Sequence, residues 1–532
     1  CGSIGIGNKG REIHAEIIRQ GISDKELIIG NALIDMYAKC GFVSKAVEVF
    51  EKLQFRDVIS WTTLIAGYAE YRHSEKALEY FELMQLEGIC PNPVTFVYIL
   101  KACNGLGDVE KGGKIHSEIA RKGLLENDIV IGNAILDMYA KFGMLTQSCQ
   151  VFENLHVRDV VSWSTLIAGY TEHGHGEEAI NAFELMYMEG VCPDIVTFLC
   201  VLKACASTGL HEAGQEIHQM VTAQRGLLRK NVKLGNALVD MYAKCGSLKK
   251  AHEVFNELHV RDVISWNAII TGFTRLGHWE EAMNYFEQMQ HEGLHPDHCT
   301  FFPILSVCGS IGAIERGKEA HDMIVRGELL EKDISLGNAL MDMYAKCGAL
   351  TKAQDVFNKL PVPNVVSWTG LISGYAQVGK DVTVVKLFNK MIQAGIQPNV
   401  VTFTVMLNAC RHSGLLHKGD MYFDAMYTHY GVIPTMEHST CMVDLFGRAG
   451  QFDKAVCIIK EMPSCDYSAV WLPLLAVCRK WGYVKLGMLV FDQTMQLDHS
   501  CSAAYALMAN IFAASGMQED AENIETMRLK YA

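Results

Sequence analysis

One stretch of twelve residues recurs through the chain, and its spacing constrains the fold more than any other feature. Residues 30–41 read GNALIDMYAKCG, and near copies begin at Gly132, Gly235 and Gly337, at intervals of 102, 103 and 102 residues. Repetition at a fixed period is typical of stacked-repeat architectures, in which each unit buries its apolar face against the next. The fold can therefore be inferred from one repeat unit.

The repeat unit has the pattern of paired helices. Leu33, Ile34 and Tyr37 share one helical face, and Gly41 is suited to end that helix in a left-handed cap. A second apolar face at helical spacing follows directly, made by Ala46, Val49, Phe50 and Leu53. We predict an all-α fold, a right-handed superhelical solenoid of antiparallel helix-hairpin repeats.

Each interval divides into three hairpins of about 31, 35 and 36 residues, called here short, middle and long. In chain order they are predicted at 27–57, 58–92, 93–128, 129–159, 160–194, 195–231, 232–262, 263–297, 298–333, 334–364, 365–399 and 400–435. Residues 1–26 align with part of a long hairpin, and 436–467 form a divergent short one. Two further helical pairs are expected in 468–532. We expect repeats upstream of residue 1 in the natural protein and a truncated C-terminal extension.

The overall composition argues against a general nucleic-acid-binding or membrane protein. The formal net charge is −13, whereas phosphate contacts usually need clustered Lys and Arg, although a local basic track is compatible with an acidic exterior. Charged or polar residues interrupt every apolar run before the roughly 20 residues that span a bilayer. We therefore expect no membrane partner.

The 18 cysteines follow the repeat and do not form metal-binding clusters. Two repeat positions hold eight of them: Cys1, Cys103, Cys205, Cys308 and Cys410 at one, and Cys40, Cys245 and Cys347 at the other. Because Phe142 replaces cysteine in the second copy, we predict small buried side chains in a reducing compartment and no metal site. Packing or a satisfied hydrogen bond is likewise expected at His14, His116, His218 and His321.

The motifs carried by the three hairpin lengths resemble those of one family. VxSWxxLIxGY, VTFxxxLKAC and GNALxDMYAKCG, in units of 35, 36 and 31 residues, look like the P, L and S motifs of plant pentatricopeptide repeat (PPR) proteins. Residues from Val470 to Leu507 are similar to the extension motifs of organellar RNA-editing factors. Tetratricopeptide repeats, the nearest competitor, keep a period of about 34 residues and lack this alternation. A tetratricopeptide-like protein-binding scaffold remains the alternative.

The resemblance implies that single-stranded RNA is read at one nucleotide per repeat. Two positions vary among small polar residues in an otherwise constant frame, namely the fifth and the last residue of each short and middle hairpin. The implied base-reading residues are Asn31, Asp57, Thr62, Asn92, Asn133, Asp159, Ser164, Asp194, Asn236, Asp262, Asn267, Asp297, Asn338, Asn364, Thr369 and Asn399. The competing interpretation is structural, because such residues also cap helices and form turns.

Two further sets fit an RNA groove. The second residue of a hairpin is apolar in most copies and, by the resemblance, sandwiches bases; these residues are Ile28, Ile59, Val130, Val161, Ile264 and Val366, whereas Lys233 and Ser335 depart from the pattern. The thirteenth residue of the short hairpins is basic and is a candidate phosphate contact. This set comprises Lys39, Lys141, Lys244, Lys346 and Arg448.

The chain lacks the residues for deaminase chemistry. A cytidine deaminase needs H-x-E and P-C-x-x-C for its zinc ion, and although His14-Ala15-Glu16 fits the first, no C-x-x-C occurs. We predict no catalytic residues, no cofactor and no bound metal. The resemblance implies a recognition module of a C-to-U editing factor in the mitochondrion or chloroplast, with a downstream deaminase domain, partner deaminase or editing cofactor.

The family's pairing rule also implies a target sequence. Thr or Ser at the fifth position selects purines and Asn selects pyrimidines, while a final Asp favours G or U and a final Asn favours A or C. The implied target is 5′-UAnUGnUUn(C/U)Ann, upstream of the edited C. Long hairpins are unassigned because Val97, Leu199 and Phe302 cannot hydrogen-bond a base. The pairs Thr404/Thr435 and Thr440/Tyr467 also fall outside the rule.

Overall fold

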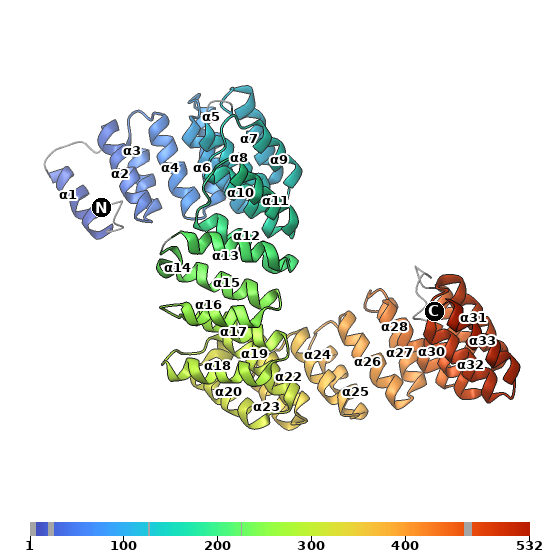
Figure 1. Cartoon of the computed structure of the whole chain (residues 1–532). Helices are drawn as coiled ribbons and strands as arrows, with labels where there is room; N and C mark the ends of the chain where they lie inside the picture. The colour runs from blue at the N-terminus through green and yellow to red at the C-terminus, as the bar shows by residue number, and fades with distance from the viewer. Residues whose placement is uncertain (1–6, 20–25, 126–127, 225, 462–470, 532) are drawn as a thin grey trace. The chain divides into compact units, whose positions relative to one another are not determined.

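The computed structural model describes residues 7–19, 26–125, 128–224, 226–461 and 471–531 (Figure 1). Cys1, Tyr467 and Val470 lie outside these ranges. Helices make up 78% of the structure, and no strand occurs in the described residues. The predicted all-α solenoid of helical hairpins is confirmed. None of the helices in these ranges is both long enough and apolar enough to cross a membrane.

The chain forms two compact units, Cys1–Leu276 and Gly277–Ala532, which are described separately. The short hairpins are α2 (Leu27–Lys39) with α3 (Val43–Lys52), α8 (Ile129–Lys141) with α9 (Leu145–Asn154), α15 (Val232–Lys244) with α16 (Leu248–Glu257), α22 (Ile334–Lys346) with α23 (Leu350–Lys359), and the divergent α28 (Met436–Arg448) with α29 (Phe452–Glu461). The middle hairpins are α4 (Val58–Glu70) with α5 (Ser74–Leu86), α10 (Val160–Glu172) with α11 (Gly176–Met188), and α24 (Val365–Gln377) with α25 (Asp381–Gln393). In the remaining middle hairpin, α17 (Val263–Arg275) ends the first unit and α18 (Trp279–His291) begins the second.

The long hairpins are α6 (Pro93–Leu106) with α7 (Val109–Arg121), α12 (Ile195–Thr208) with α13 (His211–Ala223), α19 (His298–Ile311) with α20 (Ile314–Arg326), and α26 (Val400–Ser413) with α27 (Leu416–Thr428). Two of them continue into a single turn, α14 (Leu227–Lys230) and α21 (Leu329–Lys332). Helix α1 (Gly7–Arg19) precedes the first short hairpin. The C-terminal pairs are α30 (Trp471–Trp481) with α31 (Val484–Leu497) and α32 (Ser502–Ala514) with α33 (Gln518–Tyr531).

Local sequence sets the ends of these helices. Asp57 caps α4 in a capping box with Ser60, and Asn92 caps α6 in the same way with Thr95. Gly41 has a φ of +80°, as predicted for a glycine that ends a helix, because this left-handed conformation costs other residues energy. Each hairpin therefore has its own start and stop signals.

Within each unit the first helices of successive hairpins pack against one another in a row. Within the first unit α2 contacts α4, α4 contacts α6, and α6 contacts α8 (Figure 1). Small residues allow the short and middle first helices to approach closely, since a Cβ atom added at Gly67 would lie 2.8 Å from the Cβ of Ala38. Gly169, Gly272 and Gly374 face Ala140, Ala243 and Ala345 in the same way. In each unit this row of first helices carries the fifth residue of the hairpins.

The recurrent histidines have the hydrogen bond that the sequence predicts. Nδ1 of His116 lies 2.9 Å from the hydroxyl of Tyr139, and burial lowers the pKa of this histidine. His14, His218 and His321 make the same contact with Tyr37, Tyr242 and Tyr344. A structural role for these histidines is confirmed.

The cysteine prediction is confirmed at one repeat position and needs correction at the other. Cys103, Cys205, Cys308 and Cys410 are free and buried, and burial raises the pKa of Cys103 to about 11. Cys40, Cys245 and Cys347 are only half-buried. The thiol of Cys245 lies 3.6 Å from the carbonyl oxygen of Cys205, so it faces the neighbouring long hairpin and is not enclosed by its own.

Candidate nucleic-acid interface

The two candidate reading positions occupy different places in the helices. The fifth residues lie inside the first helix of their hairpin, so the capping interpretation is wrong for them. The last residues are N-caps, and each accepts a backbone hydrogen bond from the next helix. They are Asp57, Asn92, Asp159, Asp194, Asp262, Asp297, Asn364 and Asn399. For these residues capping is established, and the question is what else they contact.

In three short hairpins the fifth and last residues form a closed hydrogen-bond network. Nδ2 of Asn31 donates to Oδ1 of Asp57 at 3.2 Å, and the hydroxyl of Ser60 donates to Oδ1 of Asn31 at 2.6 Å. The pairs Asn133/Asp159 with Ser162 and Asn236/Asp262 with Ser265 repeat these bonds at 3.2 and 2.7 Å and at 3.0 and 2.6 Å. Because the asparagine amide has a donor on one side and an acceptor on the other, its orientation is fixed.

The fourth short hairpin differs. Oδ1 of Asn364 accepts from the backbone amides of Val366 and Ser367 and from the Ser367 hydroxyl, at 3.0, 3.0 and 3.1 Å. Oδ1 of Asn338 is buried and has no hydrogen-bond partner. The Asn338 amide therefore lacks the serine contact that orients Asn31.

The middle hairpins pair their reading residues through a threonine of the next helix. The hydroxyl of Thr62 lies 2.7 Å from that of Thr95, which donates to Oδ1 of Asn92 at 2.9 Å. The hydroxyl of Thr369 likewise lies 2.7 Å from that of Thr402, which donates to Oδ1 of Asn399 at 2.9 Å. Ser164 lies 2.7 Å from Thr197 and also donates to Asp194 at 3.5 Å. Asn267 lies in α17 and Asp297 caps α19, in separate units, so each is described alone.

The carboxylates in the closed networks are held in the ionised form. Partial burial by itself would raise the pKa of Asp159, but hydrogen bonds from Ser162 and Asn133 outweigh burial and lower that pKa below 3.8. The same balance lowers the pKa of Asp57 and Asp262. At neutral pH these side chains are therefore acceptors only.

The apolar second residues form an exposed row beside the reading pairs. Their exposure runs from 50% for Val161 to 84% for Ile28. Val94, Val196 and Val401, the second residues of three long hairpins, are 52% to 56% exposed. These three valines were not among the predicted base-sandwiching residues, although the VTF of the long motif marks them. Exposed apolar residues in a regular row indicate a contact surface.

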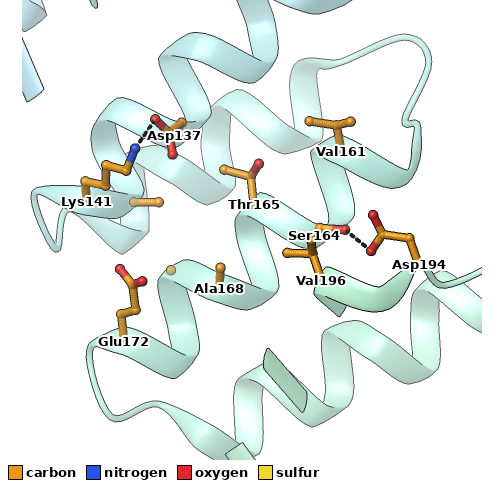
Figure 2. A pocket seen from close by; sticks show the side chains of 11 residues that line it. Asp137, Lys141, Val161, Ser164, Thr165, Ala168, Glu172, Asp194 and Val196 are labelled. Carbon is orange, nitrogen blue, oxygen red and sulfur yellow. Dashed lines mark hydrogen bonds and ion pairs between the residues drawn. The ribbon is translucent and has the colours of Figure 1, made fainter. Parts of the chain in front are cut away.

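Each unit contains a pocket between two residues of this row. In the first unit Val161 and Val196 border a pocket of about 280 Å³, with Ser164 and Asp194 among its lining residues. Figure 2 shows that pair, joined by a dashed line, at one end and Lys141, Asp137 and Glu172 at the other. In the second unit Val366 and Val401 border a pocket of about 360 Å³, with Thr369 and Asn399 in its lining. Both pockets place a reading pair between two exposed valines.

Every candidate phosphate residue already has an anionic partner. The Nζ atom of Lys141 lies 2.7 Å from Asp137, one helical turn earlier, and both side chains are about half exposed. Lys39, Lys244 and Lys346 pair with Asp35, Asp240 and Asp342 at the same distance. Arg448 pairs with Asp444 at 2.9 Å. Since exposed pairs of this kind are weak, an RNA phosphate can compete for the cation.

The unassigned pair Thr404/Thr435 is bridged by a histidine. Nδ1 of the fully buried His438 accepts from the Thr435 amide at 3.0 Å, and Nε2 lies 2.9 Å from the carbonyl oxygen of Val400 and 3.0 Å from the Thr404 hydroxyl. Because the amide can only donate, Nδ1 is unprotonated and Nε2 carries the proton. This ring replaces the serine or threonine of the other networks.

Comparison with known proteins supplies the family. The PPR repeat family models match residues 56–105, 158–207, 261–309 and 363–412, and residues 31–58, 236–263, 338–362, 401–429 and 438–467. A putative pentatricopeptide repeat-containing protein of Arabidopsis thaliana is 33% identical over 98% of this chain and 76% of its own length. A mitochondrial Arabidopsis protein of the same description is 32% identical over 96% of this chain and 92% of its own length.

The fold also matches a solved structure. The crystal structure of maize pentatricopeptide repeat protein PPR10 has a TM-score of 0.62, 16% sequence identity, and coverage of 99% of this chain and 83% of that one. PPR10 has also been crystallised with an 18-nucleotide psaJ RNA element, with the same TM-score and identity.

Proposed function

The chain belongs to the pentatricopeptide repeat family of plant type, and we propose that it binds single-stranded RNA in a sequence-dependent manner, one nucleotide per repeat. The observation that carries this proposal is the placement of a polar reading pair, linked directly or through a threonine, between two exposed valines in both pockets. Valine faces suit the two faces of a base, and the polar pair suits its edge. The PPR10 complex with RNA supports the same use of this fold.

The chemistry of the last residue accounts for its part in base selection. An ionised Asp159 can only accept, so it suits the N–H donors on the Watson–Crick edges of U and G. An asparagine such as Asn399 can also donate, which suits the ring-nitrogen acceptors of A and C. The proposed target remains 5′-UAnUGnUUn(C/U)Ann.

We further propose that the protein is a PLS-class recognition module for C-to-U editing in a plant organelle. The motif lengths and the tail from Val470 to Leu507 support the class, and related Arabidopsis proteins are named mitochondrial or chloroplastic. The chain has no C-x-x-C to complete a zinc site. In this proposal it positions the RNA, and deamination belongs to a downstream domain, a partner deaminase or an editing cofactor.

Competition binding with RNAs that differ at one nucleotide tests the proposal. Asn133→Thr keeps Asp159 and should move the preference at the fourth nucleotide from U toward G, by roughly 1–3 kcal/mol if the contact resembles bidentate readout in DNA. Asn154→Thr, the same change at an exposed site on α9, is the matched control. Binding without sequence preference in the unchanged protein would refute base reading and favour the scaffold alternative.

A further inference from the structure

The first helices of the middle hairpins end in residues of different charge. The last residue is Glu70 in α4, Glu172 in α10, Arg275 in α17 and Gln377 in α24. All four side chains are exposed. The short hairpins, in contrast, carry a basic residue at the corresponding position every time, lysine in four copies and arginine in the divergent one. A position that is constant in charge in one hairpin type and ranges from acidic to basic in the other is free of a common packing role.

The acidic residues are unfavourable for the helix itself. The C-terminal end of a helix carries partial negative charge, which favours Lys or Arg there and disfavours Glu. Neither Glu70 nor Glu172 forms an ion pair with any residue that the structure describes. A repeated departure from a local rule without a visible compensating contact is typical of functional positions.

Two of the four residues line the pockets of the candidate RNA site. Glu172 lines the first-unit pocket with Ser164 and Asp194, and Gln377 lines the second-unit pocket with Thr369 and Asn399. Lys141 is the one cation among the described residues that line the first of these pockets, and Asp137 already pairs with it. The hydrogen bond that Lys39 donates to Asp35 is the main cause of the raised pKa of Lys39, and the nearby charge of Glu70 adds to it.

The local charge therefore changes sign along the chain. Asp35, Lys39 and Glu70 sum to one negative charge, as do Asp137, Lys141 and Glu172. Asp240, Lys244 and Arg275 sum to one positive charge, and Asp342, Lys346 and Gln377 to zero. Lys101 and Lys203 are exposed on the following long hairpins and offset part of the first two negative charges. Single substitutions are therefore more informative than the summed charges.

We propose that the last residue of the first helix in each middle hairpin sets how strongly the RNA backbone is held at that step. The backbone is repelled beside Glu70 and Glu172 and held by Arg275, which is a further phosphate contact. This inference rests on the proposed RNA binding and adds to it. Recognition by the first two middle hairpins then depends on base contacts, while sequence-independent affinity is concentrated near Arg275.

Salt-dependent binding of the full chain to the proposed target and to a scrambled RNA tests this inference. Arg275→Glu should weaken binding to both RNAs roughly tenfold at low salt, and Glu172→Arg should strengthen both by a similar factor, because one unit charge about 6 Å from a phosphate in water changes affinity roughly threefold. The log–log salt slope should fall by about 0.7 in the first variant and rise by about 0.7 in the second.

Glu184→Arg on α11 and Lys249→Glu on α16 make the same charge changes at exposed sites outside these pockets. If Glu172→Arg and Arg275→Glu only match these controls while the unchanged protein still prefers its target, the inference is wrong and the proposed function stands. A change in base preference at the fifth nucleotide in Glu172→Arg would also overturn it, because Glu172 would then contact the base. Loss of target preference in the unchanged protein would instead refute the proposed function.

Discussion

The short hairpins 129–159 and 334–364 share a sequence frame and a capping box but differ in the contact between their reading residues. Asn133 donates to Asp159 and accepts from Ser162. Oδ1 of Asn338 is buried without a partner. The Ser162 hydroxyl contacts both Asp159 and Asn133, whereas the Ser367 hydroxyl contacts Asn364. The last residue caps the next helix in both hairpins, yet only aspartate completes the network that orients the fifth residue.

This difference separates two roles that one side chain performs. Capping needs an oxygen that accepts from the next helix, and both Asp159 and Asn364 provide it. Orienting the fifth residue needs an acceptor facing its amide, which an aspartate provides on either oxygen. We call 129–159, which has the complete network, the closed hairpin, and 334–364, which lacks it, the open hairpin. We expect the closed hairpin to distinguish U from C and the open hairpin to accept both.

Exchanging the last residues should have the largest effect. Asn364→Asp should close the network and shift the tenth nucleotide from C or U to U alone. Asp159→Asn should open the network at the fourth nucleotide and admit C. By analogy with base contacts in DNA, each shift is roughly 1–3 kcal/mol in competition binding. Unchanged C-to-U ratios in both variants would show that the network does not control readout.

Replacing the capping-box serine should destabilise the helix start more at α10 than at α24. Ser162→Ala removes the box and the bond to Asn133, so opening of the start of α10 should become easier by about 1–2 kcal/mol. Ser367→Ala lacks the second contribution and should cost about 1 kcal/mol less. Amide hydrogen exchange in α10 and α24 measures both. Equal losses would mean that the Ser162 to Asn133 bond adds no stability.

Lowering the pH should remove part of the stability that the Asp159 carboxylate contributes to the closed hairpin. The folded pKa of Asp159 lies below the ordinary value of 3.8, so its contribution is complete above that value and is lost as the pH falls through the folded pKa. The stability difference between the unchanged protein and Asp159→Asn should therefore narrow below about pH 4. Thermal denaturation at pH 7, 5 and 3.5 measures the difference, and a constant difference would contradict this prediction.

The smallest effect concerns a feature that the two hairpins share. Lys141 and Lys346 both pair with an aspartate at 2.7 Å. Lys141→Ala and Lys346→Ala should each reduce the salt slope by about 0.7, as expected for one phosphate on a single strand, and should leave base preference unchanged. Unequal slopes would show that the lysine contact depends on the network beside it.

Much of this arrangement follows from periodicity in the sequence. The repeats predict helix starts at Leu27, Val58 and Pro93, where the structure has them. The ion pair of Asp137 and Lys141 was not predicted, although residues four apart share a helix face and the spacing is a local signal for it. The contact of His116 with Tyr139 depends on the packing of two hairpins and has no local signal.

Sequence alone also leaves capping and reading as alternatives for Asp159. The capping bond spans three residues, whereas the bond to Asn133 spans 26. Local sequence rules can predict only the first bond, because the second depends on how one hairpin stacks on the next. The structure places both contacts on one carboxylate, so the two interpretations are compatible.

The shared use of the N-cap has an evolutionary consequence. A mutation at the last residue of a hairpin must preserve an N-cap, and Asp, Asn and Ser are nearly equal in that role while most other residues are not. Changes between Asp and Asn therefore keep the helix start. In the short hairpins they alter the bond to the fifth residue, and in all these hairpins they are free to alter the RNA that is selected. Selection for a stable helix start therefore limits the last residue of a hairpin to a few residue types. Exchange among those types is easy, so such repeats can acquire new RNA targets by that route.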